Sequence, residues 1–471
     1  MVVRGYSKMK AVLVLLAACV AAAAAGRSPN ADLVMEYMEL KGHQPGARYS
    51  NNIIADALAD VPDLIARYNY PVEQHFVTTS DGYILQMHRI PHGRDRNNQP
   101  GDRTAVYLLH GMMQSSADWV LMGPGEGLAY TLAEEGYDVW IGNTRGNYYS
   151  RNHTTLDPDD KNSLRFWQFS WDEMGSIDLP ASIDYILNLK GHSKLHYVGF
   201  SQGSTVFTVM GSIRPEYNAK IISYQGVAPA VLSENNEENP INWVANYEGI
   251  LMILANRYGI GELGARSPLF TWLGLALCSE ESPVHPLCLS VATMEETVAR
   301  LNAIIIEIEQ NTWLGLALCS EESPVYPLCL SVATMKETVA RLNATMIPVF
   351  IGHGPAGVSV RQMGHYAQCI AKGFRRYDYG LIGNLATYGT RQPPFYNLKF
   401  ITAPTYLHYS LNDQRVNYLD VYLLGERISS PVKYYQVADE KWSHLDFAWG
   451  SNQVEMYQKN VISAMREAEA L

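Results

Sequence analysis

Residues 195–205 read LHYVGFSQGST, an apolar run that leads into Ser201, with Gly199 before it and Gly203 after it. The pattern G-x-S-x-G occurs once in this chain. VGF before the serine predicts a strand, and QGSTVFTVMGS after it predicts a helix. A sharp turn between strand and helix lifts a serine Oγ above a sheet, and the small glycines let the two elements approach closely. The stretch therefore predicts Ser201 as a nucleophile.

Strand-like and helix-like segments alternate on both sides of this stretch. An Asp-Gly turn centres an early hairpin, VEQHFVTTSDGYILQMHRIP, and IADALADVPDLIARYNYP before it predicts a short helix. The alternation predicts an α/β fold, with a mostly parallel central sheet flanked by helices. Buried strands are predicted in AVYLLHG (105–111), DVWIGNT (138–144), KLHYVGF (194–200), KIISYQGVAP (220–229), APTYLHYSLND (403–413) and KYYQVADEKW (433–442).

The first residues predict a secretory signal. Basic residues in the first ten are followed by AVLVLLAACVAAAAA at 11–25, and Ala23 and Ala25 form an A-x-A cleavage site. This apolar run is short for a membrane span, so we expect residues 1–25 to be removed and no stable span to remain. The formal net charge of -11 and the lack of a long basic run argue against a nucleic-acid partner.

The strand pattern is interrupted after about residue 232 and returns near residue 398. We therefore expect one core domain in two parts, 26–232 and 398–471, with a large helical insertion, 233–397, placed to cover a site as a cap or lid. Within it, 271–303 and 312–344 are near-identical and differ only at His285/Tyr326 and Glu295/Lys336. Structural repeats usually diverge further, so a recent tandem duplication and an error in the gene model both stay open.

A nucleophilic serine needs a base, and the base needs an orienting acid. On a sheet of this kind the chain order is serine, acid, histidine. Asp413 ends the run APTYLHYSLND, and His444 follows the last strand in WSHLDFAWG. Both positions are at C-terminal ends of strands, where ligands bind in open α/β sheets. For the oxyanion hole, the sequence predicts the backbone N–H groups of Met112, in LLHGMMQSSADW, and of Gln202.

Other acids and histidines have simpler interpretations. Asp439 and Asp446 are rival acids, but neither ends the strand that precedes the histidine. An Asn-Asp pair after a strand is commonly just a turn. The remaining histidines considered, His110, His153, His353 and His365, are expected to be packed side chains.

Several stretches together resemble the acid lipase family of gastric and lysosomal lipases, and most of all its insect members. The resemblance implies an α/β-hydrolase core with a helical cap and lid. It implies hydrolysis of neutral lipid esters, triacylglycerols or cholesteryl esters, at a lipid–water interface, with no cofactor and no metal. By position it assigns the triad to Ser201, Asp413 and His444. The matching stretches are YPVEQHFVTTSDGYILQMHRIP, LLHGMMQSSADWV, GNTRGNYYSRNHTTLDP, FWQFSWDEMGSIDLPASIDYIL, PAGVSVRQMGHYAQ, FRRYDYG and HLDFAWG.

The chain departs from the family pattern in places. Phe200 stands where the family usually has His, and we expect its ring to pack beneath the serine turn. Asn69 stands where Gly is usual. The duplication falls in the cap, where the family keeps its lid and one disulfide. Pairs Cys278–Cys288 and Cys319–Cys329 are expected, with crossed pairings open, a zinc site disfavoured by the spacing, and Cys369 left over.

Two sequons, at Asn152 and Asn343, agree with a secretory route, so the protein is expected to be secreted or lysosomal. Two other functions stay open. One is a non-catalytic lipid-binding or storage protein on the same fold, with the cap permanently shut. The other is an esterase for short-chain esters, because one fold hosts many functions.

Overall fold

The structure, a computed structural model, describes residues 51–160, 162–235, 248–266, 341 and 346–471. Two compact units divide the chain: residues 1–58 with 267–352, and residues 59–266 with 353–471. In the described part of the first unit, helix α3 (Asn51–Leu58) and most of α16 (Ile347–His353) pack closely. A Cβ on Gly352 would come within 2.3 Å of the Ala57 carbonyl oxygen. Apart from α3, the elements described below belong to the second unit.

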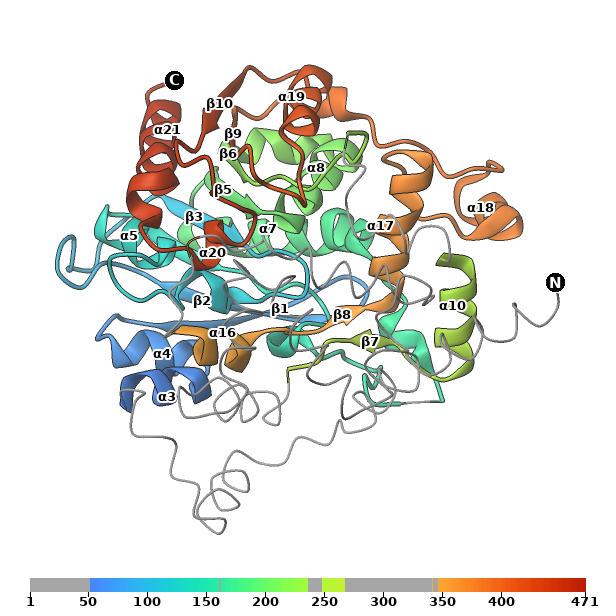
Figure 1. Ribbon diagram of the computed structural model, residues 1–471, viewed down its shortest axis with the longest axis horizontal. Helices are drawn as coiled ribbons and strands as arrows, with labels where there is room; N and C mark the ends of the chain where they lie inside the picture. The colour runs from blue at the N-terminus through green and yellow to red at the C-terminus, as the bar shows by residue number, and fades with distance from the viewer. Residues whose placement is uncertain (1–50, 161, 236–247, 267–340, 342–345) are drawn as a thin grey trace, which may run out of the picture. The chain divides into compact units, whose positions relative to one another are not determined.

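An eight-stranded sheet forms the centre of the second unit, in the order β1-β2-β4-β3-β5-β6-β9-β10 (Figure 1). All pairs from β4 to β10 are parallel, whereas β1 pairs with β2, and β2 with β4, in antiparallel fashion. The mostly parallel sheet predicted from the sequence is confirmed. The strands are β1 (Glu73–Thr78), β2 (Ile84–Ile90), β3 (Ala105–Leu109), β4 (Asp138–Ile141), β5 (Leu195–Phe200), β6 (Ile221–Val227), β9 (Thr405–Tyr409) and β10 (Val432–Gln436).

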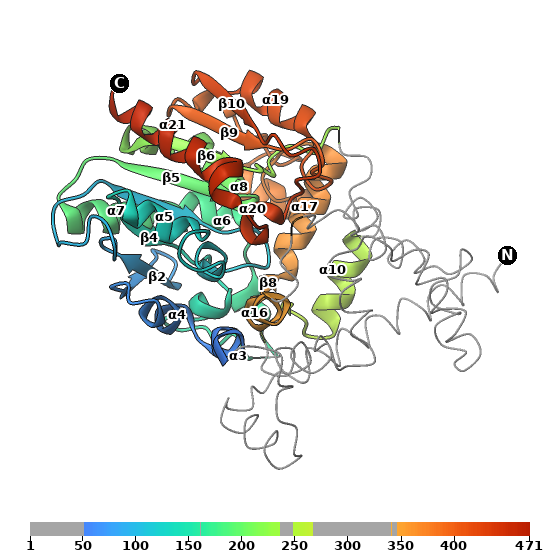
Figure 2. The ribbon, with the colours of Figure 1, turned by 60° about the vertical axis from the view of Figure 1, so that its left-hand side comes forward.

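Helices cover both faces of this sheet, as the fully buried central strands require. Alternate residues of β3 (Ala105, Tyr107 and Leu109) join a large core with apolar residues of α7, α8 and α19. On the opposite face, α21 packs through Ala464 and Ala468 against β9. Figures 1 and 2 show α5 and α21 together on one side of the strands. These helices are α5 (Leu128–Glu134), α7 (Leu179–Lys190), α8 (Gln202–Ile213), α19 (Tyr418–Arg427) and α21 (Lys459–Glu469).

Two local predictions are wrong. The single helix predicted over residues 54–71 is two helices, α3 and α4 (Val61–Arg67). Pro62 explains the break, because proline disfavours a helical residue before it and fits the first turn of a new helix. In the predicted insertion, β7 (Glu262–Leu263) pairs with β8 (Val358–Ser359), where only helices and loops were expected.

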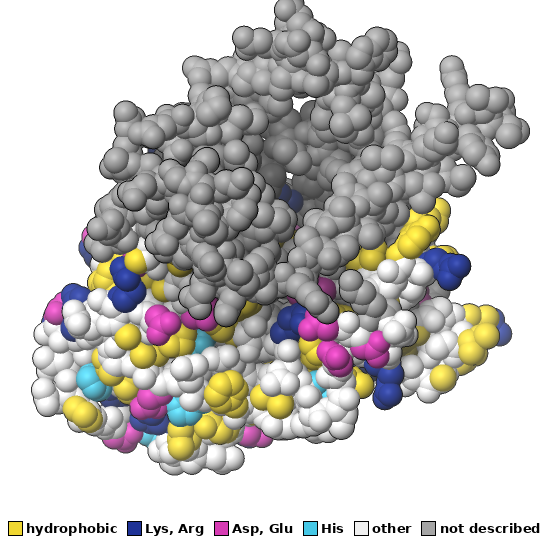
Figure 3. Space-filling model, turned by 90° about the horizontal axis from the view of Figure 1, so that it is seen from below, with side chains coloured by type: hydrophobic (Ala, Val, Ile, Leu, Met, Phe, Trp, Pro, Cys, Tyr) yellow, Lys and Arg dark blue, Asp and Glu magenta, His cyan; other side chains and the backbone are white. Residues whose placement is uncertain are grey.

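The predicted insertion contributes three further helices to the described part of the second unit. They are α10 (Glu248–Arg257), α17 (Val360–Lys372) and α18 (Gly380–Tyr388). Among the described residues, no helix is long and apolar enough to cross a membrane. Figure 3 shows Lys and Arg side chains dispersed among acidic ones over the described part of the face it presents.

Buried histidines make the fold sensitive to acid. Burial lowers the pKa of His88 in β2, His408 in β9 and His365 in α17 to about 3 in each case. An unfolded histidine titrates near 6.5, so between about pH 3 and 6.5 the unfolded chain binds more protons. Stability is therefore full above about pH 6.5. Each histidine costs about 1.4 kcal/mol per pH unit as the pH falls towards 3.

We expect His408→Gln to lose less stability than the parent between pH 6.5 and pH 4.5, because glutamine carries no titrating proton. A glutamine N–H can still donate to Gln225 Oε1, which His408 Nε2 contacts at 2.9 Å. Urea unfolding at each pH measures the difference, with His192→Gln at the half-exposed His192 as the matched control. Equal acid sensitivity in His408→Gln and parent would exclude this origin.

Candidate active site

Ser201 occupies a strained turn between β5 and α8. Its φ of 49° and ψ of -112° lie in a region that side-chain-bearing residues rarely adopt. The turn is fixed on both sides: the Ser201 N–H donates to the Val227 carbonyl at 2.9 Å, and its carbonyl accepts from the Ser204 N–H at 3.0 Å. The sequence VGF-S-QG thus builds the strand–serine–helix turn that the motif predicts.

Close backbone contacts explain the two glycines around Ser201. A Cβ on Gly199 would lie 2.6 Å from the carbonyl carbon of Gly203. A Cβ on Gly203 would lie 2.3 Å from the carbonyl oxygen of Leu109 at the end of β3. Real Cβ atoms do not approach backbone this closely, so a side chain at either position must move α8 away from the sheet. The glycines therefore set the height of Ser201 above the strands.

We expect Gly203→Ala to destabilise the fold by about 1–3 kcal/mol, the usual cost of overpacking, and to lower ester hydrolysis by displacing Ser201. Gly211→Ala on the same helix is the matched control, since its Cβ would first meet a side-chain carbon of Ile401 at 3.0 Å. Urea unfolding and kcat on a soluble ester measure both effects. Wild-type activity and stability in Gly203→Ala would contradict the steric argument.

Three predicted residues meet through hydrogen bonds although they are far apart in the chain. His444 Nε2 lies 2.9 Å from Ser201 Oγ, and His444 Nδ1 lies 2.7 Å from Asp413 Oδ2. All three residues are buried, with 7 to 8% of their surface exposed. Asp413 follows β9 and His444 follows β10, so the C-terminal ends of three parallel strands bring them together.

The proton on His444 is placed by its neighbours. An ionised Asp413 carboxylate only accepts, so Nδ1 carries the hydrogen and donates to it. Nε2 then holds the lone pair that faces the Ser201 hydroxyl. The other carboxylate oxygen, Oδ1, accepts from the N–H groups of Arg415 at 2.8 Å and Val416 at 2.9 Å, which fixes the carboxylate plane. This arrangement lets His444 take a proton from Ser201 Oγ.

The rival acids have local partners instead. Asp446 Oδ2 accepts from the backbone N–H of Ser443 at 2.8 Å and from its hydroxyl at 3.0 Å. Asp439 Oδ1 accepts from the Lys441 N–H at 3.0 Å. Both carboxylates therefore close turns around the His444 loop.

Two of the other histidines considered, His365 and His153, have hydrogen-bond partners within the fold. His365 is fully buried, with Nδ1 2.9 Å from Ser170 Oγ and Nε2 2.8 Å from the Arg375 carbonyl, and its ring stacks on Trp171 at 3.6 Å. His153 Nε2 donates to the Asp81 carbonyl at 2.8 Å. These contacts satisfy both rings within the fold.

The two predicted oxyanion donors are placed by different elements. Gln202 is the first residue of α8, where backbone N–H groups have no acceptor within the helix. Met112 lies in the turn after β3, and this turn is held at Met113, whose φ is 62° and whose carbonyl accepts from the Ala356 N–H at 2.7 Å. We retain both as proposed donors.

His110 stiffens the start of this turn. Its Nδ1 lies 2.7 Å from the Gly111 carbonyl, and its Nε2 accepts from the Thr144 N–H at 3.2 Å. Burial lowers the pKa of His110 to about 4, so the ring is neutral at ordinary pH and acts as one donor and one acceptor. The residue is thus a structural part of the loop that carries Met112.

Phe200 lies beside the histidine ring. Its ring centroid is 5.1 Å from that of His444, with an interplanar angle of 32°. A Cβ added to Gly111 would come within 3.2 Å of two Phe200 ring carbons, so the ring also borders the turn before Met112. The ring is buried and contacts both the His444 side and the Gly111 side of the site, while its expected position beneath the serine turn stays a prediction.

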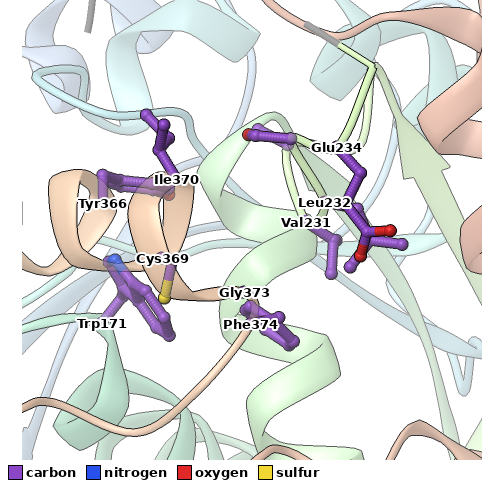
Figure 4. A pocket seen from close by; sticks show the side chains of 11 residues that line it. Trp171, Val231, Leu232, Glu234, Tyr366, Cys369, Ile370, Gly373 and Phe374 are labelled. Carbon is purple, nitrogen blue, oxygen red and sulfur yellow. The ribbon is translucent and has the colours of Figure 1, made fainter. Parts of the chain in front are cut away.

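A pocket of about 350 Å³ lies between α17 and the segment after β6 (Figure 4). Figure 4 shows Cys369 and Trp171 on one side of it and Val231 and Leu232 on the other. Burial raises the pKa of Cys369, the cysteine left unpaired in the sequence, to about 12. The side chains of Ser201, Asp413 and His444 do not line this pocket. The lining residues are Trp171, Ala230, Val231, Leu232, Ser233, Glu234, Tyr366, Cys369, Ile370, Gly373 and Phe374.

Other predicted sites are placed only in part. Asn152 is exposed, as a glycosylated asparagine must be. Within the described residues, no group of three or more His, Cys, Asp or Glu side chains could hold a metal ion. Asn343, the signal segment and the duplicated stretches, apart from residue 341, lie outside the described residues. So do the paired cysteines, which are Cys278, Cys288, Cys319 and Cys329.

Comparisons with known proteins give the family. Residues 61–123 match the partial alpha/beta-hydrolase lipase region, and residues 104–324 match the alpha/beta hydrolase fold. Lipase 1 of Drosophila melanogaster is 37% identical, over 88% of this chain and 81% of that protein. Gastric triacylglycerol lipase of Bos taurus is 32% identical, over 88% of this chain and 92% of that protein. Lysosomal acid lipase/cholesteryl ester hydrolase of Homo sapiens is 32% identical, over 87% of this chain and 91% of that protein. This chain therefore belongs to the gastric and lysosomal acid lipase family, on an α/β-hydrolase fold.

Proposed function

We propose that this protein is a serine lipase that hydrolyses the carboxylic esters of neutral lipids, triacylglycerols or cholesteryl esters. The hydrogen-bonded series Ser201–His444–Asp413 at a strained strand–helix turn carries the proposal. The names of the relatives, which include a triacylglycerol lipase and a cholesteryl ester hydrolase, support the substrate class. No cofactor enters the proposed reaction.

The first proposed half-reaction forms an acyl-enzyme. His444 Nε2 accepts the Ser201 hydroxyl proton while Oγ attacks the ester carbonyl carbon. The backbone N–H groups of Met112 and Gln202 stabilise the oxyanion that develops. Losing one such donor typically costs about 10²–10³ in kcat. Asp413 stabilises the charged His444, and Nε2 then gives its proton to the departing alcohol.

The second half-reaction repeats these roles with water. His444 Nε2 takes a proton from water as the hydroxyl attacks the acyl carbon, and returns it to Ser201 Oγ as the fatty acid leaves. The ester is thereby split into an alcohol and an acid, with the enzyme restored. The same pair of groups serves both steps, because the imidazole cycles between neutral and charged forms.

We further propose that residues 233–397 act as a cap or lid over the site, between core parts 26–232 and 398–471. Apolar acyl chains need a surface that excludes water, and a cap that opens at a lipid–water interface supplies one. Activity that is unchanged by emulsified lipid droplets or micelles would count against an opening lid.

Hydrolysis assays on two substrates test the proposal. A long-chain triacylglycerol and a short-chain ester are offered at pH 5 and pH 7 to the full chain, to Ser201→Ala and to a version lacking residues 271–311. We expect the full chain to cleave the long-chain substrate and Ser201→Ala to be inactive. Cleavage of the short ester alone indicates an esterase. Activity only in the deletion version indicates that the second copy blocks the site or is an error in the gene model.

Loss of activity in every version, with lipid binding retained, would support the lipid-binding alternative. In that case, Ser201 would be a relic of a catalytic ancestor. Binding is measured with a fluorescent long-chain ester that the enzyme cannot cleave. This outcome separates a storage protein from an enzyme that is merely inhibited by its cap.

The proposed route is secretory, to the extracellular space or to lysosomes. Cleavage after Ala25, glycans on Asn152 and Asn343, and disulfides in the cap all follow from it. Mass spectrometry of the protein secreted from insect cells, before and after glycan removal, measures all of these. A mature chain that begins at Met1 and carries no glycan would contradict the proposal.

A further inference from the structure

A buried carboxylate, Asp118, lies between the turn after β3 and the loop that carries His444. Asp118 belongs to a short 3-10 helix, Ser116–Trp119, and only 8% of its surface is exposed. Oδ1 accepts from Gln114 Nε2 at 3.0 Å and from Trp449 Nε1 at 2.6 Å. Oδ2 accepts from the Ser115 N–H at 3.2 Å, which closes a capping box.

Through Gln114, these hydrogen bonds connect Asp118 to the turn that carries the proposed oxyanion donor Met112. The side-chain oxygen of Gln114 accepts from the backbone N–H of Gly111 at 2.9 Å. Gly111 directly precedes Met112, so this bond fixes the peptide chain on the approach to the proposed donor. A rotation of the Gln114 amide would break both this bond and the one to Asp118. Asp118 therefore determines which way the Gln114 oxygen points.

Through Trp449, Asp118 is also connected to the loop that carries the proposed base, His444. Trp449 ends the short helix α20 (Asp446–Trp449), which begins just after His444. The Trp449 backbone N–H donates to the Leu445 carbonyl at 2.8 Å, so the residue that carries the indole is held by the residue next to His444. A bond from Trp449 Nε1 to Asp118 thus anchors the His444 loop to the turn after β3.

Stability alone does not explain this carboxylate. Burial raises the pKa of Asp118 to about 6, against the effect of its hydrogen bonds. Within the described residues, no cation forms an ion pair with it, and the groups that affect its pKa are Ser115, Trp449, Gln114 and its own backbone N–H. A buried charge without a partner charge is costly, and such groups concentrate at functional sites.

We propose that Asp118 is a positioning residue that joins the oxyanion turn to the loop of the catalytic histidine. Through Gln114 and Trp449 it holds both loops at a fixed separation around Ser201. This inference rests on the proposed ester hydrolysis for its kinetic consequence, but its structural content, the coupling of the two loops, is independent of any activity.

Two variants that remove hydrogen-bonding groups but keep an apolar side chain test the kinetic part. Gln114→Met removes the bonds to Gly111 and Asp118, and Trp449→Phe removes the indole N–H that donates to Asp118, together with part of the ring. With a soluble short-chain ester, we expect each to lower kcat about tenfold and to leave KM within about twofold, as loss of a transition-state contact does. In the double variant, the fold-loss in kcat should be smaller than the product of the two single losses, because both substitutions break the same connection.

Conservative rescue is expected at the centre of the connection. Asp118→Asn keeps an oxygen that accepts from Gln114 and Trp449, so it should retain most of kcat. In Asp118→Leu, which has no acceptor, kcat should fall by at least tenfold. Trp167→Phe is the matched control, since Trp167 Nε1 donates at 2.9 Å to the Pro158 carbonyl, away from these loops. It should lower the melting temperature without changing kcat.

Hydrogen exchange tests the coupling without any substrate. In Trp449→Phe, amides of residues 110–115 should exchange faster, and in Gln114→Met, amides of residues 443–449 should do so, because coupling between two sites is reciprocal. If each variant changed only its own loop, or if the double variant lost the full product in kcat, the proposal would be overturned. An inactive parent enzyme would refute the proposed function, while the exchange experiment would still decide the coupling.

Discussion

Ser201→Ala is expected to lower kcat for ester hydrolysis by about 10⁶-fold, the loss typical of a removed nucleophile in such a triad. The reason is chemical: alanine leaves His444 with no hydroxyl to deprotonate, and no acyl-enzyme forms. The fold should be retained, because the turn is held by the Ser201 backbone bonds to Val227 and Ser204, which alanine keeps. Release of fatty acid from a short and a long ester measures the effect.

The strained conformation of residue 201 gives this variant a second readout. With φ at 49°, alanine is no better suited to the turn than serine, so the melting temperature should change little. Ser212→Ala, a buried serine at the far end of α8, is the matched control and should keep full activity. Hydrolysis by Ser201→Ala at wild-type rates would show that another nucleophile works, and the proposed mechanism would fall.

The sheet was predictable because its strands are buried on both faces. Such strands appear as unbroken apolar runs, and AVYLL at β3 and LHYVGF at β5 are of this kind. The hairpin β1–β2 was predictable from its Asp-Gly turn. The break between α3 and α4 could have been read from Pro62. The β7–β8 pair could not, because two residues per strand carry no periodic signal.

The residues of the candidate site were also predictable only in part. Ser201 was found from a local pattern, and Asp413 and His444 from chain order and the ends of strands. The contact between Phe200 and the His444 ring could not be predicted, because His444 lies far away in the sequence. A hydrogen bond such as Trp449 to Asp118 leaves no mark in either local sequence.

One signal for Asp118 was present but unused. Ser115 and Asp118 are spaced as a capping box, S-x-x-D, and the structure forms that box. The pattern indicates a helix start after β3, and hence a fixed turn at Met112. It does not reveal that the same carboxylate also binds Gln114 and Trp449, because side-chain contacts of this range depend on the assembled sheet.

The proposed role of Asp413 predicts a large effect from a very small change. Asp413→Asn is expected to lower kcat by about 10⁴-fold, with KM and stability nearly unchanged. An asparagine NH₂ placed where Oδ2 stands would face His444 Nδ1 as a donor. The imidazole would then carry its hydrogen on Nε2, so the nitrogen near Ser201 Oγ could no longer accept a proton. Steady-state kinetics with a soluble ester measure the loss.

The orientation of the carboxamide is set by the rest of the loop. Residue 413 Oδ1 accepts from the N–H groups of Arg415 and Val416, and an amide oxygen satisfies both, which directs the NH₂ group towards His444. Asp439→Asn, at a carboxylate that closes a nearby turn, is the matched control and should leave kcat within about twofold of the parent, as surface substitutions away from a site usually do. If Asp413→Asn kept wild-type kcat, His444 would not depend on this carboxylate for its tautomer, and the acid of the triad would have to be sought elsewhere.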